Sequence, residues 1–474
     1  MSPLPVTPEQ LAALPPEFRA LLQAVIDHYE KRIAELEQKV ADLESRLKTS
    51  PRNSSLPPSS EHPHAKPTPT EKPAGKKRGG QPGHPQHERK LIPTELCHAV
   101  HTLKPRRCRG CGLRLTGSDP DPRRHQVFEL PQPEPIITEY IRHRLTCAGC
   151  GQTTCAELPL GVPDHTAGPR LIAVTSVLMA LFRQSKRRTA LALTELFGVP
   201  ASPGWVVKLQ GIAAAAIAPS YQELMAALPQ TPVANCDETA TKEGPHKAWL
   251  WTVVTSAFTV FAIRLTRAGC VIESLLGAGY PGVVGCDRYA GYNAFNARRQ
   301  ICWAHLKRDF QAMIDAGGQA KQIGDRLMKH LHLVFDHWHG YRAGKITRRT
   351  MQANIRKLHW PIWETLEDGE QCPHAPTVAT CRDLHQRFDQ LWMFCDHPGV
   401  EPTNNAAERA LRHAVIWRKL SFGTQSAAGS RFVESMLSVI ATCRQQHRNP
   451  LDYLTATLEA AQFHEPPPLL LNGA

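Results

Sequence analysis

The sequence predicts a multidomain α/β protein in which short strands come first and helices follow. Three observations lead to this expectation. Segments 232–236, 248–255 and 258–265 are rich in strand-forming Val, Thr, Trp and Phe, and the last two are predicted to form a hairpin. Beyond Trp303 the pattern is largely helical to about Phe394, which suggests an α/β core carrying a helical insertion. The chain of 474 residues is also too long for one compact core and suggests about three units.

The composition predicts a folded protein that binds a polyanion. The apolar fraction of 42% is ordinary for globular chains, and the formal net charge is +13. A basic excess points to nucleic acid first, although charge alone does not separate DNA from RNA or an anionic membrane. No signal peptide is visible, and the apolar stretch Leu171–Phe182 is too short to span a bilayer. Fourteen cysteines, several of them single, fit a reducing cytoplasm.

The first predicted element is a short coiled coil over residues 18–48. Its apolar positions step by alternating fours and threes, and charged residues fill the positions between them. Such a seam buries itself best against another helix, so we expect a homo-oligomer, although a helix packed on its own domain has the same pattern. The apolar positions are Leu22, Ile26, Tyr29, Ile33, Leu36, Val40, Leu43 and Leu47.

Residues 49–90 are predicted to be a disordered basic linker. They are dense in Pro, Ser, Gly, His and Lys, and they offer few large apolar side chains to offset the entropy of ordering. The tract Lys76, Lys77 and Arg78 is able to follow a phosphate backbone or lie in a minor groove. A solvated, solubilising linker is the equally weighted alternative.

A zinc-binding ribbon is predicted for residues 91–160. Cys108 and Cys111 match Cys147 and Cys150 as two Cys-x-x-Cys turns, each followed by a glycine that permits a positive φ. Four thiolates can close a tetrahedral shell around a structural Zn²⁺, and a redox dithiol is the minority alternative. Apolar residues between the turns are expected to form the ribbon's hairpins, and further Cys and His residues are spare ligands. The apolar residues are Val127, Phe128, Ile136, Ile137, Tyr140 and Ile141. The spare ligands are Cys97, His98, His101 and Cys155.

Residues 168–228 are expected to form a helical, helix-turn-helix-like DNA-binding region. A basic turn that contains Arg187 and Arg188 leads into a helix that Gly198 ends, and Ser202 is placed to cap the next helix. Helix, short Gly-containing turn and helix is the outline of that motif, but any α domain can contain it.

Three carboxylates in residues 229–425 suggest phosphodiester chemistry. Asp237 and Asp287 each follow a short apolar strand, and Glu408 lies in a polar segment further on. Two-metal cleavage of a phosphodiester needs carboxylates that converge from separate elements, and Mg²⁺ (or Mn²⁺) takes such oxygen ligands. Without metal, clustered carboxylates repel one another and take up protons instead.

Each carboxylate also has a structural interpretation. An Asp after a strand is commonly a turn or cap residue. Asn405 and Glu408 have the spacing of a capping box, in which Glu408 would only accept a backbone N–H. Glu238 competes with Asp237, and strand alternation points the two side chains to opposite faces. The joint arrangement favours the catalytic interpretation.

The order and spacing of these motifs resemble the insertion sequence 66 family of DDE transposases over nearly the whole chain. Matching pieces are the N-terminal coiled coil, the segment Arg78–His84 and the two Cys-x-x-Cys turns, which are called knuckles below. They continue with Cys236-Asp237-Glu238-Thr239, Asp287-Arg288-Tyr289-Ala290-Gly291-Tyr292, Cys302-Trp303-Ala304-His305, Pro402–Arg412, Arg418-Lys419 and Ser438–Thr442. Cys286 and Arg288 flank the second Asp where the family pattern is looser. Arg288 would favour a bound phosphate or serve as a salt-bridge partner.

The resemblance implies an RNase H-like catalytic core with the catalytic roles on Asp237, Asp287 and Glu408. The expected activity is metal-dependent cutting at element ends and transfer to target DNA, in the bacterial nucleoid and with possible accessory proteins of the same element. A zinc-ribbon and helix-turn-helix regulator with an inactive core is the alternative, and a nuclease that never rejoins is a third. Side chains expected to hold DNA, besides the linker and helical-region residues above, are His305, Lys307, Arg308, Arg409, Arg412, Arg418 and Lys419. The insertion is placed at about 315–395, and a C-terminal helical region at 426–474.

Overall fold

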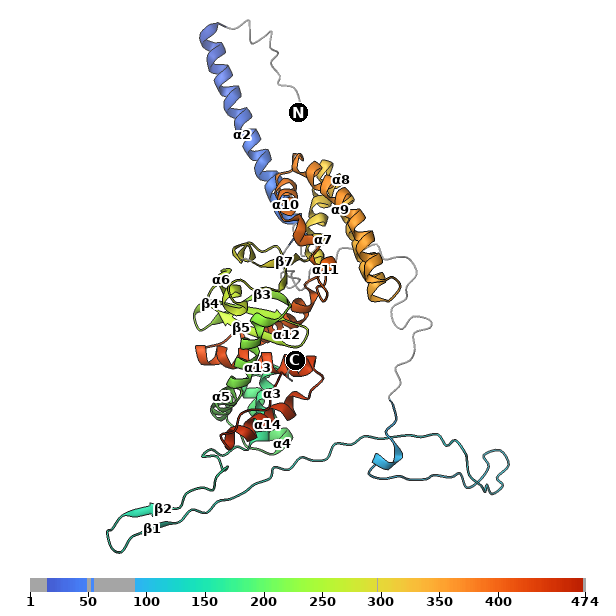
Figure 1. The fold of residues 1–474 in the computed structure, drawn as a ribbon, viewed down its shortest axis with the longest axis vertical. Coiled ribbons are helices and arrows are strands. Elements are labelled where there is room, and N and C mark those ends of the chain that lie inside the picture. The colour runs from blue at the N-terminus through green and yellow to red at the C-terminus, as the bar shows by residue number, and fades with distance from the viewer. Residues whose placement is uncertain (1–14, 49–52, 55–89, 296, 472–474) are drawn as a thin grey trace. The chain divides into compact units, whose positions relative to one another are not determined.

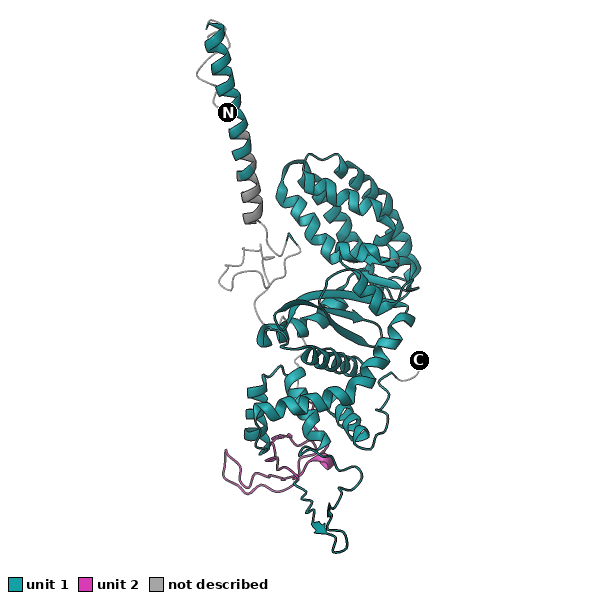
Figure 2. Ribbon diagram, turned by 90° about the vertical axis from the view of Figure 1, so that its left-hand side faces the viewer, with its two compact units in different colours: residues 1–62, 137–474 teal, residues 63–136 magenta. Residues whose placement is uncertain are grey.

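The computed structural model describes residues 15–48, 53–54, 90–295 and 297–471. The chain divides into two compact units, residues 1–62 with 137–474 and residues 63–136 (Figure 2). Most of the expected linker, including Lys76, Lys77 and Arg78, lies outside the described residues. The mixture of helices with a mixed sheet agrees with the α/β class expected from the sequence.

A five-stranded sheet forms the centre of the larger unit, in the order β5-β4-β3-β6-β7 (Figure 1). Strands β3, β4 and β5 pair antiparallel, whereas β3 with β6 and β6 with β7 pair parallel. The hairpin predicted from the strand-forming segments 248–255 and 258–265 is confirmed. The strand bounds are β3 Val233–Glu243, β4 His246–Val254, β5 Thr259–Arg264, β6 Val283–Cys286 and β7 Arg298–Ile301.

Two features of the sheet differ from the sequence-based expectation. Strand β3 does not end at Asp237 but continues to Glu243, because β4 pairs with it from Asn235 to Glu243. Polar residues hide this extension in the sequence, since only tertiary pairing makes a polar run into a strand. Strand β7, basic in sequence, was also not expected and pairs in parallel with β6.

Helix α13 (Ala427–Gln445) covers the free edge of the sheet at β5. The backbone N–H groups of Thr259 and Phe261 donate to Thr442 Oγ1 (3.2 Å) and Ser438 Oγ (2.8 Å), and that of Ile263 donates to Glu434 Oε1. Four helical residues rise about 6 Å and two strand residues about 6.6 Å, so the two rows stay in step. An exposed edge would present these donors to other chains, and here the helix satisfies them.

Helices α3 (Pro169–Ala180), α4 (Lys186–Phe197), α5 (Pro203–Ala227) and α14 (Pro450–Gln462) pack together next to α13. The predicted cap at Ser202 is confirmed, since its side chain accepts from Trp205 N, and Gly198 ends α4 at φ +65. The predicted start of the helix after the basic turn was wrong. Ser185 accepts from Arg188 N, so Lys186 to Arg188 form the first turn of α4 instead of preceding it.

The segment between β7 and α12 (Asn405–Ser421) is helical and has its own apolar core, separate from that of the sheet. Trp303, Leu306 and Leu327 are among the side chains buried there. Figure 1 shows these helices at one side of the sheet, with α3, α5 and α14 at the other. Their bounds are α7 Trp303–Ala316, α8 Gly318–Arg342, α9 Arg348–Glu370, α10 Ala375–Gln386 and α11 Met393–Asp396.

Helix α2 (Pro16–Lys48) occupies the segment predicted to be a coiled coil. Several of its apolar side chains are exposed on the chain taken alone, including Tyr29, Ile33 and Leu36. A single helix taken from a coiled coil has exposed apolar side chains at this spacing. Self-association through α2 stays a prediction.

Candidate active site at the ends of two parallel strands

Asp237 and Asp287 are brought side by side by the register of β3 and β6. The parallel pairing aligns Val233 with Val283 and Asn235 with Gly285. Asp237 and Asp287 each stand two residues beyond the last of these pairs, so they share one face of the sheet. The two residues are fifty positions apart in sequence, and the pairing of β3 with β6 brings them together.

The two aspartates are held by their own backbones. Asp237 Oδ1 accepts from Glu238 N, and Asp287 Oδ1 accepts from Tyr289 N, both at 2.9 Å. Burial raises the pKa of Asp237 well above its usual value, and the negative charges of Glu238, Asp287 and Glu408 raise it further. The pKa shift places all of these carboxylates within electrostatic range of Asp237.

Glu408 comes to the same place from the first turn of α12. The helix begins after Asn404, whose side chain makes no cap hydrogen bond and instead donates to Cys236 O of β3 at 2.6 Å. Asn404 N also contacts Cys302 Sγ at 3.1 Å, and Trp303 N donates to Pro402 O at 2.9 Å. The start of α12 is therefore fixed to the strand that carries Asp237. The capping-box interpretation of Asn405 and Glu408 was wrong, because α12 begins one residue earlier than that motif requires.

His305 lies beside Glu408, and its expected role as a DNA contact stays a prediction. Its Nε2 is 3.5 Å from Glu408 Oε1. His305 Nδ1, Glu408 Oε1 and Asn404 Oδ1 are buried and have no hydrogen-bond partner. Buried polar atoms without partners are costly unless a ligand or an ion satisfies them. Among the described residues, no three His, Cys, Asp or Glu side chains converge closely enough to hold an ion as they stand.

Glu238, the competitor of Asp237, is occupied elsewhere. It is buried, receives the guanidinium of Arg267 at 2.6 Å and accepts from Tyr292 Oη at 2.8 Å. Arg267 also stacks on the ring of Tyr289, with its guanidinium carbon 3.6 Å from the ring centre. Tyr289 N donates to Asp287 Oδ1, and Glu238 directly follows Asp237 in the chain. The contacts among Glu238, Arg267 and Tyr289 therefore connect the backbone at Asp237 to the backbone at Asp287. Glu238 is therefore a positioning residue in this arrangement.

Arg288 resolves one alternative left open by the sequence. Its guanidinium binds Asp309 of α7 at 2.8 Å and Asp383 of α10 at 3.0 Å. Arg288 is half-buried where it contacts these two carboxylates, and burial raises the pKa of Asp309. The salt-bridge interpretation holds, and Arg288 ties the loop after Asp287 to the helical segment. Sequence reasoning missed Asp309 and Asp383, because nothing along the chain connects them to Asp287.

Of the side chains expected to hold DNA, most are exposed. Arg187, Arg188, Lys307, Arg409, Arg412 and Lys419 face solvent, and Arg308 is half-buried. Arg418 differs, because its guanidinium donates to Ala240 O of β3, and burial lowers its pKa. Arg418 therefore anchors α12 to the sheet, and its expected role as a DNA contact needs that hydrogen bond to break.

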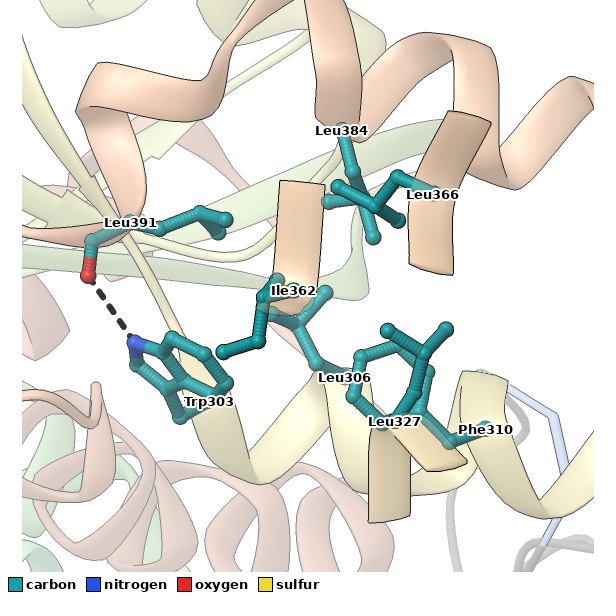
Figure 3. Close-up of a pocket in the computed structure, with 8 residues that line it drawn as sticks. All are labelled: Trp303, Leu306, Phe310, Leu327, Ile362, Leu366, Leu384 and Leu391. Carbon is teal, nitrogen blue, oxygen red and sulfur yellow. Dashed lines mark hydrogen bonds between the residues drawn. The ribbon is translucent and has the colours of Figure 1, made fainter. Parts of the chain in front are cut away.

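The hollows of the surface lie away from the carboxylates. One, lined by Trp303, Leu306, Phe310, Leu327, Ile362, Leu366, Leu384 and Leu391, has no room for a water molecule and is packed core (Figure 3). Another, of about 350 Å³, is lined by Glu370, Arg382, His385 and Gln386. Neither contains Asp237, Asp287 or Glu408.

Comparison with known proteins identifies the family. Residues 165–432, which contain the sheet, the helical segment and all three carboxylates, match the family described as "Transposase IS66 family". The chain belongs to the IS66 family of transposases. Residues 6–90 match a second family, described as "Family of unknown function (DUF6444)".

Relatives of this IS66 transposase include three proteins of Sinorhizobium fredii. "Uncharacterized protein y4qI" is 28% identical over 237 residues, 45% of this chain and 43% of that protein. "Uncharacterized protein y4hP" is 23% identical over 396 residues, 75% of this chain and 70% of that protein. "Uncharacterized protein y4jO" is 28% identical over 150 residues, 31% and 43% respectively. The chain thus spans less than half the length of the first of these relatives.

The cysteine knuckles of this IS66 transposase have matching local geometry. Cys108 N donates to Leu113 O and Cys147 N donates to Gln152 O, both at 2.9 Å. The glycines after the second cysteines, Gly112 and Gly151, have φ of +75 and +72, as the sequence predicted. Hydrogen bonds from the backbones of Cys111 and Cys150 lower the pKa of Cys108 and Cys147. The two knuckles belong to different compact units.

The expected hairpins between the knuckles are not formed. Strands β1 (Arg144–Thr146) and β2 (Thr153–Cys155) instead flank the second knuckle, and residues 127–141 have no strand pairing. Their apolar side chains are exposed, with Ile136 at 98%. A hairpin needs a covered apolar face for stability, and most of these apolar side chains face solvent. In the described part of the transposase, no helix is long and apolar enough to cross a membrane.

Proposed function

We propose that this IS66 family member is a DNA transposase that cuts strands at the ends of its element and joins them to target DNA. The observation that carries the proposal is the shared register of Asp237 and Asp287, with Glu408 pinned beside them through Asn404. We further propose an RNase H-like core. It is supported by the strand order, in which β4 alone runs against the other four strands.

The carboxylates supply the type of donor atom that divalent cations such as Mg²⁺ take. Asp237, Asp287 and Glu408 supply hard oxygen ligands, which Mg²⁺ or Mn²⁺ prefers. Burial and the neighbouring negative charges keep the pKa of Asp237 high, and Glu408 Oε1 is buried without a hydrogen bond, so a bound cation would offset the repulsion and supply a contact for that oxygen. When bound, two such ions stabilise charge on the attacking and leaving oxygens of a phosphodiester.

The chain's own residues position this chemistry. Asn404 fixes the first turn of α12 on β3, the Glu238–Arg267 pair holds the loop after Asp287, and Arg288 fastens that loop to α7 and α10. The proposed reaction has two steps. Hydrolysis at the element's end leaves a 3′-hydroxyl, and this hydroxyl then attacks a target phosphodiester, releasing the target's own 3′-hydroxyl. No covalent enzyme intermediate is needed.

The remaining partners are proposed on the same basis. Double-stranded DNA, as element terminal repeats and as target, would contact the exposed basic side chains of α4, α7 and α12. Pairing of protomers through α2 would bring two element ends together. Accessory proteins of the same element remain an expectation from the family, with no contact assigned.

Strand cutting and joining on a labelled element-end duplex with Mg²⁺ tests the proposal. Glu408→Gln keeps the size and one oxygen of the side chain but removes its charge, so we expect about a hundredfold loss of cutting. DNA binding measured without metal should stay unchanged. Equal activity of the variant and the wild type would make Glu408 structural. Binding without cutting by both would favour the regulator with an inactive core, and cutting without joined products would favour a nuclease.

The prediction that Cys108, Cys111, Cys147 and Cys150 hold one structural Zn²⁺ is also a proposal. It is supported by the matching turns and by the lowered pKa of the first thiol of each knuckle. We expect one zinc per chain by elemental analysis, and none in a Cys147→Ser/Cys150→Ser variant. Cys270→Ser, at an exposed single cysteine of α6 (Cys270–Leu276), is the matched control and should keep the metal. Zinc retained by the double variant would contradict the prediction.

A further inference from the structure

Helix α12 ends in an unusual surface feature. Phe422 occupies the position after the helix in a left-handed conformation, with φ +59, and its side chain is 80% exposed. Glycine is the usual residue there, because a bulky side chain with positive φ is strained. A strained, exposed aromatic side chain gains nothing for the folded chain alone. Such strain is a reason to look for a function.

The backbone around Phe422 is held rigidly by the sheet. Thr424 N donates to Lys242 O at 3.0 Å, and Gly244 N donates to Thr424 O at 2.8 Å. A Cβ on Gly423 would lie 2.7 Å from Lys242 O, so the chain must approach β3 closely at that point. These contacts fix the loop against β3 and its turn into β4. Phe422 is consequently presented on a rigid base rather than on a loose loop.

The charge around Phe422 favours a polyanion. Lys419 lies in the last turn of α12, and Lys242 of β3 contacts the residues directly after Phe422; both are exposed. His246 and Lys247, at the start of β4, are exposed on the same hairpin. Further along the outer face of α12, Arg409 and Arg412 are exposed at helical spacing from Lys419, while Ala407, Leu411 and Ala414 face the core. Basic residues therefore follow the helix from the carboxylates to Phe422.

We propose that Phe422 stacks on or inserts beside a DNA base, at a fixed distance from the bond that the carboxylates cut. Glu408 and Phe422 are fourteen residues apart on one helix, about 21 Å along its axis. We place α12 along the duplex axis as part of this proposal; a duplex rises about 3.4 Å per base pair, so the contact then falls roughly six base pairs from the cut phosphate. Aromatic side chains beside basic tracks hold unstacked bases in this way. The inference rests on the proposed function for the position of the cut.

An element-end duplex with 2-aminopurine, which fluoresces when unstacked, placed in turn at four to eight base pairs from the cut tests the proposal. We expect a fluorescence rise at one position with the wild type. Phe422→Ala should lose this rise and bind about tenfold more weakly. Phe422→Gly should also lose it, yet keep or raise the melting temperature, because glycine relieves the left-handed strain. Trp360→Ala, which removes a 70% exposed aromatic side chain of α9, should keep the rise.

The outcomes separate this inference from the proposed chemistry. A wild type that cuts without any rise, or a rise that persists in both Phe422 variants, overturns the role of Phe422 alone. A rise that depends on Phe422 in a protein that binds but never cuts supports the contact and contradicts the transposase chemistry. Loss of self-association in Phe422→Ala with an unchanged DNA signal assigns the side chain to a protein contact and overturns the proposal.

Discussion

Asp237→Asn is expected to abolish strand cutting while making the metal-free protein more stable. The substitution removes a ligand charge from the site, and we expect a loss of about 10³-fold or more. Stability should change in the opposite direction, because burial and the charges of Glu238, Asp287 and Glu408 oppose ionisation of Asp237. Removing that charge relieves the repulsion. A neutral side chain of the same shape therefore separates catalysis from folding.

The pH dependence has a definite sign. The pKa of Asp237 in the folded protein lies above its unfolded value of about 3.9, so ionisation costs stability as pH rises from there through the folded pKa. Thermal unfolding without metal should show this loss in the wild type and a smaller one in Asp237→Asn. Added Mn²⁺ should raise the melting temperature of the wild type only. Asp325→Asn, at an exposed carboxylate of α8, is the matched control and should behave as the wild type. An Asp237→Asn variant that is less stable at neutral pH, or that still cuts, would contradict the prediction.

Glu434→Ala is expected to cost about 2–4 kcal/mol of the free energy of unfolding. Glu434 is buried on α13, accepts the Ile263 N–H of the sheet edge, and pairs with Arg264 at 2.7 Å and Arg431 at 2.6 Å. Truncation leaves the buried N–H of Ile263 without a partner and breaks both ion pairs. Urea unfolding followed by circular dichroism measures the change.

Two further variants locate the cause of that loss. Glu434→Gln keeps an acceptor for the Ile263 N–H and should cost less than Glu434→Ala. Ser438→Ala removes only the partner of Phe261 N and should cost about 1–3 kcal/mol. If Glu434→Ala unfolded at the same urea concentration as the wild type, α13 would not be closing the edge of the sheet. Increased aggregation of the variants would support the protective role.

The three candidate carboxylates could be named before the fold was known, but their proximity could not be derived from spacing. Asp287 directly after a short apolar strand was predicted and observed. Asp237 was placed at a strand end, whereas it lies inside β3. The error arose because strand propensity depends on pairing, and β4 makes the polar residues beyond Asp237 part of the sheet.

The residues that support the site were less visible still. Asn404, Arg267, Asp309 and Asp383 act through contacts with elements distant in sequence, such as the hydrogen bond from Asn404 to Cys236 O and the ion pairs of Arg288. No local pattern marks them. His305 was predicted as a DNA contact, and only the packing of α7 against α12 places it beside Glu408.

Local side-chain and backbone chemistry determined the secondary structure of each segment, and tertiary pairing determined which other segments it contacts. The sequence by itself determined the glycine turns of the knuckles, the cap at Ser202, the β4–β5 hairpin and the helices after Trp303. These depend on side chains and dihedral angles within a few residues. The tertiary structure alone decided that Asp237 and Asp287 share a register, that α13 closes the sheet edge and that Phe422 stands exposed on a rigid base. Such features need partners far along the chain, and their free energy exists only after the elements have packed.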